Sequence, residues 1–104
     1  MRIIVLFNLK PGTTAADYET WAKTRDLPGV RSLASIDNFQ VYRATGLLGS
    51  TAAPPYAYVE VIDVADMDGF GTDVASDAMQ AITAEFAEFA DAPHFILTDP
   101  LSMA

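Results

Sequence analysis

One acidic residue stands in the middle of a run that otherwise resembles a buried strand. Glu60 lies within residues 56–62 (YAYVEVI), and because side chains on a strand repeat every two residues, it shares a face with Tyr58. Burial beside aromatic rings would raise the pKa of this carboxyl and suit it to proton transfer. A salt bridge to Arg43 on a neighbouring strand would instead keep Glu60 ionised and structural. The sequence leaves both interpretations open.

His94 is the only histidine in the chain. Histidine is the side chain whose ordinary pKa lies near physiological pH, which makes His94 a candidate catalytic acid or base. Its position at the start of a short strand, beside Pro93 and Asp91, fits a partly exposed histidine with one structural hydrogen bond equally well.

Aromatic side chains could form a box for a planar organic ligand. Tyr18 and Trp21 fall at helical spacing and could face Tyr58 and Phe39 on a sheet. Such residues more often belong to the core. Buried tyrosine hydroxyls need hydrogen-bond partners, however, so a cluster of tyrosines favours a site more than a cluster of phenylalanines does.

Two other polar residues could hold a ligand at the ends of such a cavity. Asn8 lies near the end of the first strand-like run, and Asp26 stands just before Leu27 and Pro28. A carboxylate before such a turn most simply accepts hydrogen bonds from backbone amides, although Asp26 could also point into the mouth of the cavity.

Motifs for cofactors and metals are absent from the sequence. It contains no phosphate-binding glycine loop and no G-x-S-x-G nucleophile elbow. One histidine without any cysteine cannot build a histidine-rich or thiolate zinc site. We therefore expect an activity that uses no cofactor and no metal.

The composition argues against several classes of partner. Fourteen acidic and six basic side chains give a formal charge of -8, which would repel nucleic acid and anionic membranes.

A length of 104 residues with 51% hydrophobic side chains predicts one globular domain spanning residues 1–104. The apolar run at residues 3–7 is too short for a membrane span and has no signal-peptide cleavage site, so we expect a cytoplasmic protein.

Hydrophobic spacing and turn residues divide the chain into six main elements. The predicted order is a strand at 2–9, a helix capped by Thr14 and ended by Leu27-Pro28-Gly29, an extended segment at 30–45, a strand at 56–64, a helix from the Asp66 cap to Asp91 and Pro93 with a break near Ser76, and a strand at 94–98.

This order predicts a ferredoxin-like βαββαβ fold of the α+β class, with a four-stranded antiparallel sheet and both helices on one face. The strands carry apolar residues on both sides, so the second face also needs a cover. The sheet of a second copy is the simplest cover, which predicts a homodimer of the α+β barrel type.

Several segments together resemble the REDY-like proteins. They are residues 24–28 (TRDLP), 30–33 (VRSL), 37–41 (DNFQV), 55–61 (PYAYVEV), 89–93 (FADAP) and 95–98 (FILT). The resemblance implies a dimeric α+β barrel of bacterial secondary metabolism, notably of the pathways to red tripyrrole, prodiginine-like pigments. Distant relatives of that barrel include cofactor-free cyclases, isomerases and small monooxygenases that enclose aromatic ligands.

The leading hypothesis is a small cofactor-independent enzyme that cyclises or isomerises an aromatic or heteroaromatic intermediate by proton transfer. Glu60 and His94 would move protons. The residues expected to hold the substrate are Asn8, Tyr18, Trp21, Asp26, Phe39 and Tyr58. The alternative is a binding or carrier protein that uses the same cavity without chemistry.

Overall fold

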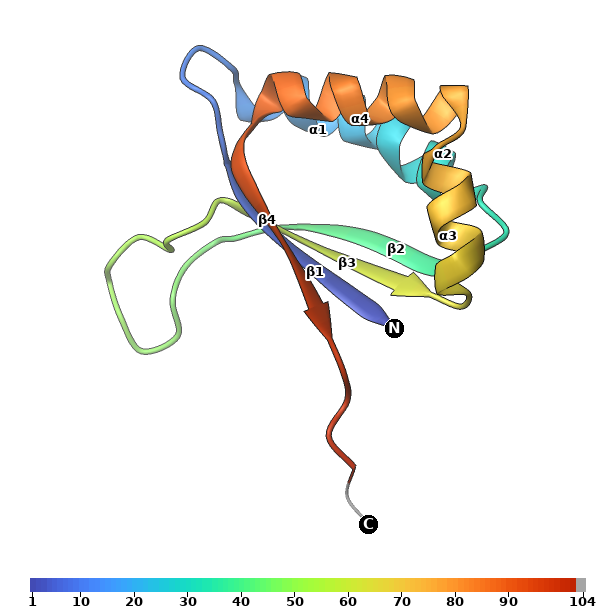
Figure 1. The fold of residues 1–104 in the computed structure, drawn as a ribbon. Coiled ribbons are helices and arrows are strands. Elements are labelled where there is room, and N and C mark those ends of the chain that lie inside the picture. The colour runs from blue at the N-terminus through green and yellow to red at the C-terminus, as the bar shows by residue number, and fades with distance from the viewer. Residues whose placement is uncertain (103–104) are drawn as a thin grey trace.

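The computed structural model describes residues 1–102, which form one sheet with helices packed against it (Figure 1). Along the chain the elements are β1 (Arg2–Leu9), α1 (Ala15–Trp21), a π-helical turn (Ala22–Asp26), α2 (Leu27–Arg31), β2 (Ile36–Arg43), β3 (Tyr58–Val64), α3 (Met67–Val74), α4 (Asp77–Phe89) and β4 (Ala90–Thr98).

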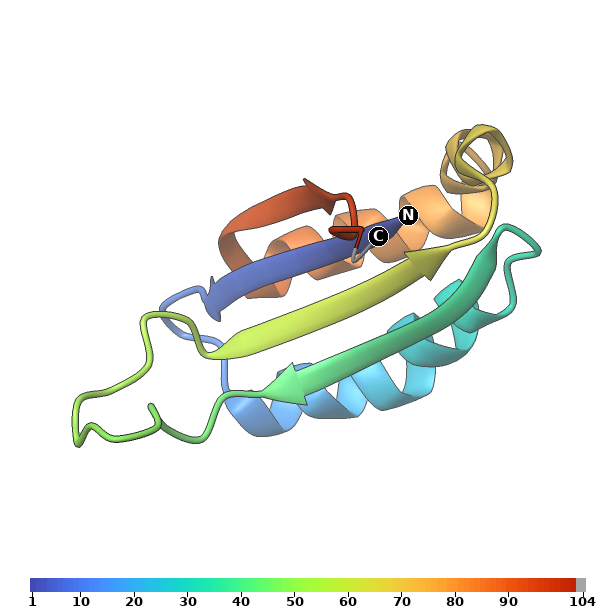
Figure 2. The same ribbon diagram turned by 90° about the horizontal axis from the view of Figure 1, so that it is seen from below.

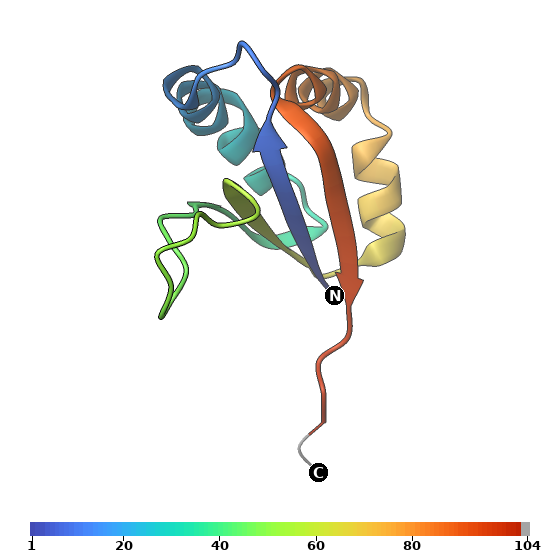
Figure 3. The same cartoon turned by 90° about the vertical axis from the view of Figure 1, so that its left-hand side faces the viewer.

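The four strands are antiparallel and lie in the order β2-β3-β1-β4. All helices cover one face of this sheet, as Figure 3 shows from the side, and Figure 2 views the sheet from its uncovered face. The predicted α+β ferredoxin-like fold is therefore confirmed.

Two predicted features of the helices have a clear local cause. The Thr14 hydroxyl accepts a hydrogen bond from the backbone N–H of Asp17 at 3.1 Å and starts α1. The Ser76 hydroxyl likewise accepts from the backbone N–H of Met79 at 3.3 Å, which restarts the helix after the predicted break. Asp66 is the N-cap residue of α3, but its side chain makes no capping hydrogen bond.

The first helix does not end at Leu27-Pro28-Gly29, and that prediction is wrong. The backbone N–H of Leu27 bonds to the carbonyl of Ala22, five residues back, and this wider π-helical turn leads directly into α2. Pro28 then lies in the first turn of α2 and does not end the helical chain. The chain stays helical to Arg31, so the extended segment predicted from residue 30 shortens to β2.

Gly29 serves helix packing rather than a turn. A Cβ atom at this position would lie 2.4 Å from the Cδ1 atom of the buried Ile82. The glycine therefore lets α2 approach α4 closely.

The last strand begins earlier than predicted. Asp91 and Pro93 lie inside β4 and do not close the preceding helix. Ala92 has a φ of 44°, next to a register shift between Leu6 and Asn8 of β1, which marks a bulge. Proline is tolerated here because β4 is an edge strand.

The strand register divides the side chains between two faces of the sheet. On the face toward the helices, Val41, Glu60, Val5 and Phe95 form one row across the four strands. On the uncovered face, two rows carry mainly apolar side chains: Gln40, Val61, Ile4 and Ile96 in one, and Tyr42, Val59, Leu6 and His94 in the other.

Candidate functional site

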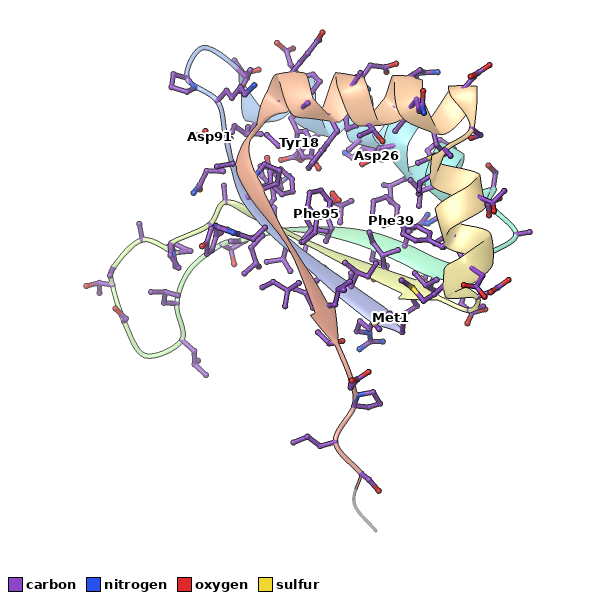
Figure 4. All side chains as sticks on the ribbon, viewed as in Figure 1. Met1, Tyr18, Asp26, Phe39, Asp91 and Phe95 are labelled. Carbon is purple, nitrogen blue, oxygen red and sulfur yellow. The ribbon has the colours of Figure 1, made fainter. Side chains whose placement is uncertain are left out.

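A cavity of about 130 Å³ lies between the covered face of the sheet and the helices. Figure 4 shows Asp26 under the helices, and Phe39 and Phe95 between the helices and the sheet. Nine of the twelve lining side chains are apolar: Val30, Phe39, Ile62, Phe70, Val74, Met79, Ile82, Phe86 and Phe95. The other three are Asp26, Glu60 and Thr83, so two carboxyls lie in an otherwise apolar cavity.

Glu60 reaches this cavity because of its place in the alternating pattern of β3. Tyr58, Glu60 and Ile62 all point toward the helices, and Glu60 is only 4% exposed. Its Oε2 atom has no hydrogen-bond partner among residues 1–102. Burial, with a second contribution from the nearby Asp26, raises the pKa of Glu60 well above its usual value.

The proposed salt bridge between Glu60 and Arg43 does not form. Arg43 pairs with Glu19 of α1 instead, through both its Nε and its Nη2 atoms. Together with the side-chain hydrogen bonds from Arg43 and Tyr58, this pair lowers the pKa of Glu19 to about 2. Arg43 is thus paired with Glu19, and Glu60 has no ion-pair partner among residues 1–102.

Asp26 is the second carboxyl of the cavity and lies at the end of the π-helical turn. It is 5% exposed, and burial raises its pKa to about 7. The interpretation of Asp26 as a turn residue is therefore wrong, because the helix continues past it. Local π-helical turns often occur at functional sites, and this one lies where the acid enters the cavity.

A four-residue spacing in the sequence could have revealed the position of Asp26. Tyr18, Ala22, Asp26 and Val30 are all buried, and together they form the inner stripe of the continuous helical segment. The break predicted at Pro28 hid this stripe.

The hydroxyl of Tyr18 is a further buried polar atom, although Tyr18 lines a second cleft beside β2 and not the cavity with the two acids. Tyr18 is fully buried, and its ring centroid lies 4.7 Å from that of Tyr58 and 5.5 Å from that of Phe7. Its hydroxyl has no hydrogen-bond partner among the described residues. Burial, followed by the charges of Glu60 and Asp26, raises the pKa of Tyr18 above the usual range of a phenol.

The rest of the predicted aromatic box does not form a single site. Phe39 lines the cavity with the two acids. Tyr58 instead lines a separate open cleft of about 320 Å³ beside β2, and its hydroxyl donates a hydrogen bond to Oε2 of Glu19 at 2.8 Å. The indole N–H of Trp21 donates to Oε1 of Glu85 at 2.8 Å, and this bond ties α1 to α4.

His94 and Asn8 lie away from the cavity. His94 is paired with Leu6 on the uncovered face of the sheet, so the structure does not bring it together with Glu60. Its ring centroid lies 5.9 Å from that of Tyr56. The amide of Asn8 donates to the carbonyl of Pro55 at 3.1 Å and accepts from the backbone N–H of Ala57 at 2.9 Å, so it holds the loop before β3.

Residues 1–102 also show what other kinds of site they do not form. This part of the chain holds no cluster of three or more side chains suited to bind a metal. Within the same residues, no helix is long and apolar enough to cross a membrane.

The fold and the cavity define a ferredoxin-like α+β protein with two buried acids between sheet and helices. The family model of the REDY-like protein HapK matches residues 1–101, so the chain belongs to this family. The crystal structure of HapK from Hahella chejuensis is similar, with a TM-score of 0.69 and 26% identity over 100% of both chains.

Two other solved structures share the fold. A dimeric ferredoxin-like protein of unknown function from Thermobifida fusca is 23% identical, with a TM-score of 0.69 over 91% of this chain and 85% of that chain. SnoaB from Streptomyces nogalater, a cofactor-independent oxygenase, is 10% identical, with a TM-score of 0.71 over 99% of this chain and 96% of its own. No protein of curated function matches the sequence significantly.

Substitution of Tyr18 and Tyr58 by phenylalanine should have opposite effects on the ligand-free protein. A buried hydroxyl without a hydrogen-bond partner lowers stability by about 1–3 kcal/mol. Tyr18→Phe removes such a hydroxyl, so the free energy of unfolding should rise by about 1 kcal/mol. Tyr58→Phe removes the hydrogen bond to Glu19, so the same quantity should fall by about 1 kcal/mol. Urea denaturation measures both. A loss in Tyr18→Phe as large as that in Tyr58→Phe would show that the Tyr18 hydroxyl has a partner.

Proposed function

We propose that this chain is a small cofactor-independent enzyme that moves protons on an aromatic or heteroaromatic intermediate of bacterial secondary metabolism. The observation that carries the proposal is the pair of buried carboxyls, Asp26 and Glu60, in a cavity with mainly apolar walls. Cyclisation and isomerisation of such rings both need an acid and a base that act without bulk water.

The two carboxyls suit different halves of one proton transfer. Asp26, with a pKa of about 7, is partly ionised at neutral pH and can accept a proton from the ligand. Burial and the neighbouring Asp26 raise the pKa of Glu60 well above its usual value, which favours its protonated form as the proton donor. The proton taken from one ligand atom and the proton given to another balance, so the reaction needs no other reactant. Asp26 takes the role that the sequence analysis gave to His94.

The size of the cavity limits what reacts there. A dry apolar cavity of roughly 150 Å³ accepts a benzene ring, and this one measures about 130 Å³. We infer that one ring enters at a time, either a monocyclic intermediate or one ring of a larger molecule such as a tripyrrole precursor. Phe95, which lines the cavity and is 58% exposed, would border the opening.

Family membership supports the pathway, and a structural neighbour supports the absence of a cofactor. The chain belongs to the HapK family, whose REDY-like members we associate with pathways to prodiginine-like pigments. SnoaB, which shares the fold, is described as a cofactor-independent oxygenase. Because one fold carries many activities, this neighbour supports the type of site rather than the reaction.

A carrier of a hydrophobic intermediate is the second candidate. The observation that favours it is the predominance of apolar side chains in the cavity wall, which can bind a ring whether or not chemistry follows. Recovery of the bound intermediate unchanged, at one molecule per cavity, would support the carrier over the enzyme.

We also propose that two copies pair through the uncovered face of the sheet. The two rows centred on Val61, Ile4, Val59 and Leu6 form a mainly apolar surface, and solved structures with this fold include dimeric ferredoxin-like proteins. A two-fold contact between identical faces would cover these rows.

Amide substitutions test the proposed proton transfer. Asp26→Asn and Glu60→Gln keep the shape of each side chain but remove its titration, so each should lower turnover by about 10²–10⁴-fold. The assay would use intermediates made by the enzymes encoded beside this gene. Glu88→Gln on the exposed side of α4 is the matched control and should retain turnover. Full turnover in the Asp26→Asn, Glu60→Gln double variant would contradict the mechanism.

A charge on the uncovered face tests the dimer. Light scattering at micromolar concentration should give about twice the chain mass of 11.2 kDa for the wild type, and Val61→Lys should give the monomer because a lysine at the centre of the contact lacks a partner. Ala81→Lys on the exposed side of α4 adds the same charge elsewhere and should remain dimeric. A monomeric wild type would overturn the proposed pairing.

A further inference from the structure

None of the chain's six basic side chains neutralises the acid pair in the cavity. Arg2, Arg25 and Arg43 form ion pairs with Asp63, Glu85 and Glu19, respectively. Arg31 donates from Nε to the backbone carbonyl of Phe39 at 2.9 Å, and Lys10 and Lys23 are exposed. His94 lies on the other face of the sheet. No basic side chain of residues 1–102 therefore supplies a positive charge beside Asp26 and Glu60, and a cationic ligand could supply one.

The buried polar atoms indicate that a ligand belongs at this position. Glu60 is 4% exposed and lines the cavity, and its Oε2 atom has no partner within residues 1–102. A buried acceptor left without a hydrogen bond lowers stability, and a donor on a ligand would remove that cost.

The walls of the cavity also suit a cation. Four of the lining side chains are phenylalanines, namely Phe39, Phe70, Phe86 and Phe95. The faces of aromatic rings carry negative electrostatic potential and attract organic cations, most strongly where water is excluded. An anionic ligand would meet two acids and no compensating cation, which disfavours it.

We propose that the cavity selects a single-ring ligand that carries a basic nitrogen and binds it as a cation beside the Asp26 and Glu60 carboxyls. A neutral base takes the proton of one carboxyl: the N–H bond forms as the O–H bond breaks, and the total charge of the complex does not change. The ligand then donates a charge-assisted hydrogen bond to the resulting carboxylate. The proposal rests on the proposed function, because it names the class of ring on which the acid pair acts.

Three rings of similar size and different charge test this selectivity. 4-Aminopyridine is a cation at neutral pH, aniline is its neutral isostere, and benzoate is an anion. Titrations followed by backbone amide NMR would give a dissociation constant for each, and the shifted resonances would show whether binding maps to the cavity. We expect 4-aminopyridine to bind at least tenfold more tightly than aniline, and benzoate not to bind.

Amide variants separate charge recognition from simple packing. In the Asp26→Asn, Glu60→Gln double variant, 4-aminopyridine should lose its advantage of tenfold or more while aniline still binds. Glu88→Gln removes an exposed carboxylate on α4 and should leave the preference intact. The amide NMR spectrum of each variant verifies that it folds.

The possible failures point to different errors. If aniline binds the wild type as tightly as 4-aminopyridine, the proposed selection of a basic ring is overturned while the proposed enzyme stands. If the double variant keeps the preference, the carboxyls do not cause it and the selectivity proposal is likewise overturned. If none of the rings binds at millimolar concentration, the cavity takes no aromatic ring, and the proposed function fails with the inference.

Discussion

The arrangement of this protein depends on the burial of two carboxyls, Asp26 and Glu60, for which residues 1–102 supply no counter-charge. Burial disfavours the ionised form, so the folded chain holds protons that the unfolded chain releases. Asp26 titrates at about 7 in the folded state and near ~3.9 when unfolded. Its contribution to stability is therefore full below about pH 4 and is lost as the pH rises through about 7.

The surrounding structure keeps these acids apart from the charged surface. Three arginines pair with Glu19, Asp63 and Glu85 outside the cavity, and no basic side chain among residues 1–102 lines the cavity itself. The π-helical turn carries the helix past Asp26, and Gly29 lets the following turn pack against Ile82. The same features that close the core therefore hold the acid pair in place.

Much of this fold could be predicted because its signals are local. The two-sided strand at β1, the Thr14 cap and the break at Ser76 follow from short-range patterns, and strand periodicity placed Glu60 beside Tyr58. The role of Asp26 was predicted wrongly because a proline normally ends a helix at the residue before it, whereas here the helical chain continues through Pro28 to Arg31. The partner of Arg43 and the face of His94 depend on strand register and helix position, which local sequence does not specify.

We expect Asp26 and Glu60 to form a proton-holding pair inside a mainly apolar cavity. NMR titration of the side-chain carboxyl carbons of the ligand-free protein tests it directly. We expect Asp26 to titrate near pH 7 and Glu60 to titrate well above an ordinary glutamate, and we expect Asp26→Asn to lower the pKa of Glu60 by removing a neighbouring charge. Titration of both carboxyls near pH ~4, the range of exposed acids, would contradict it.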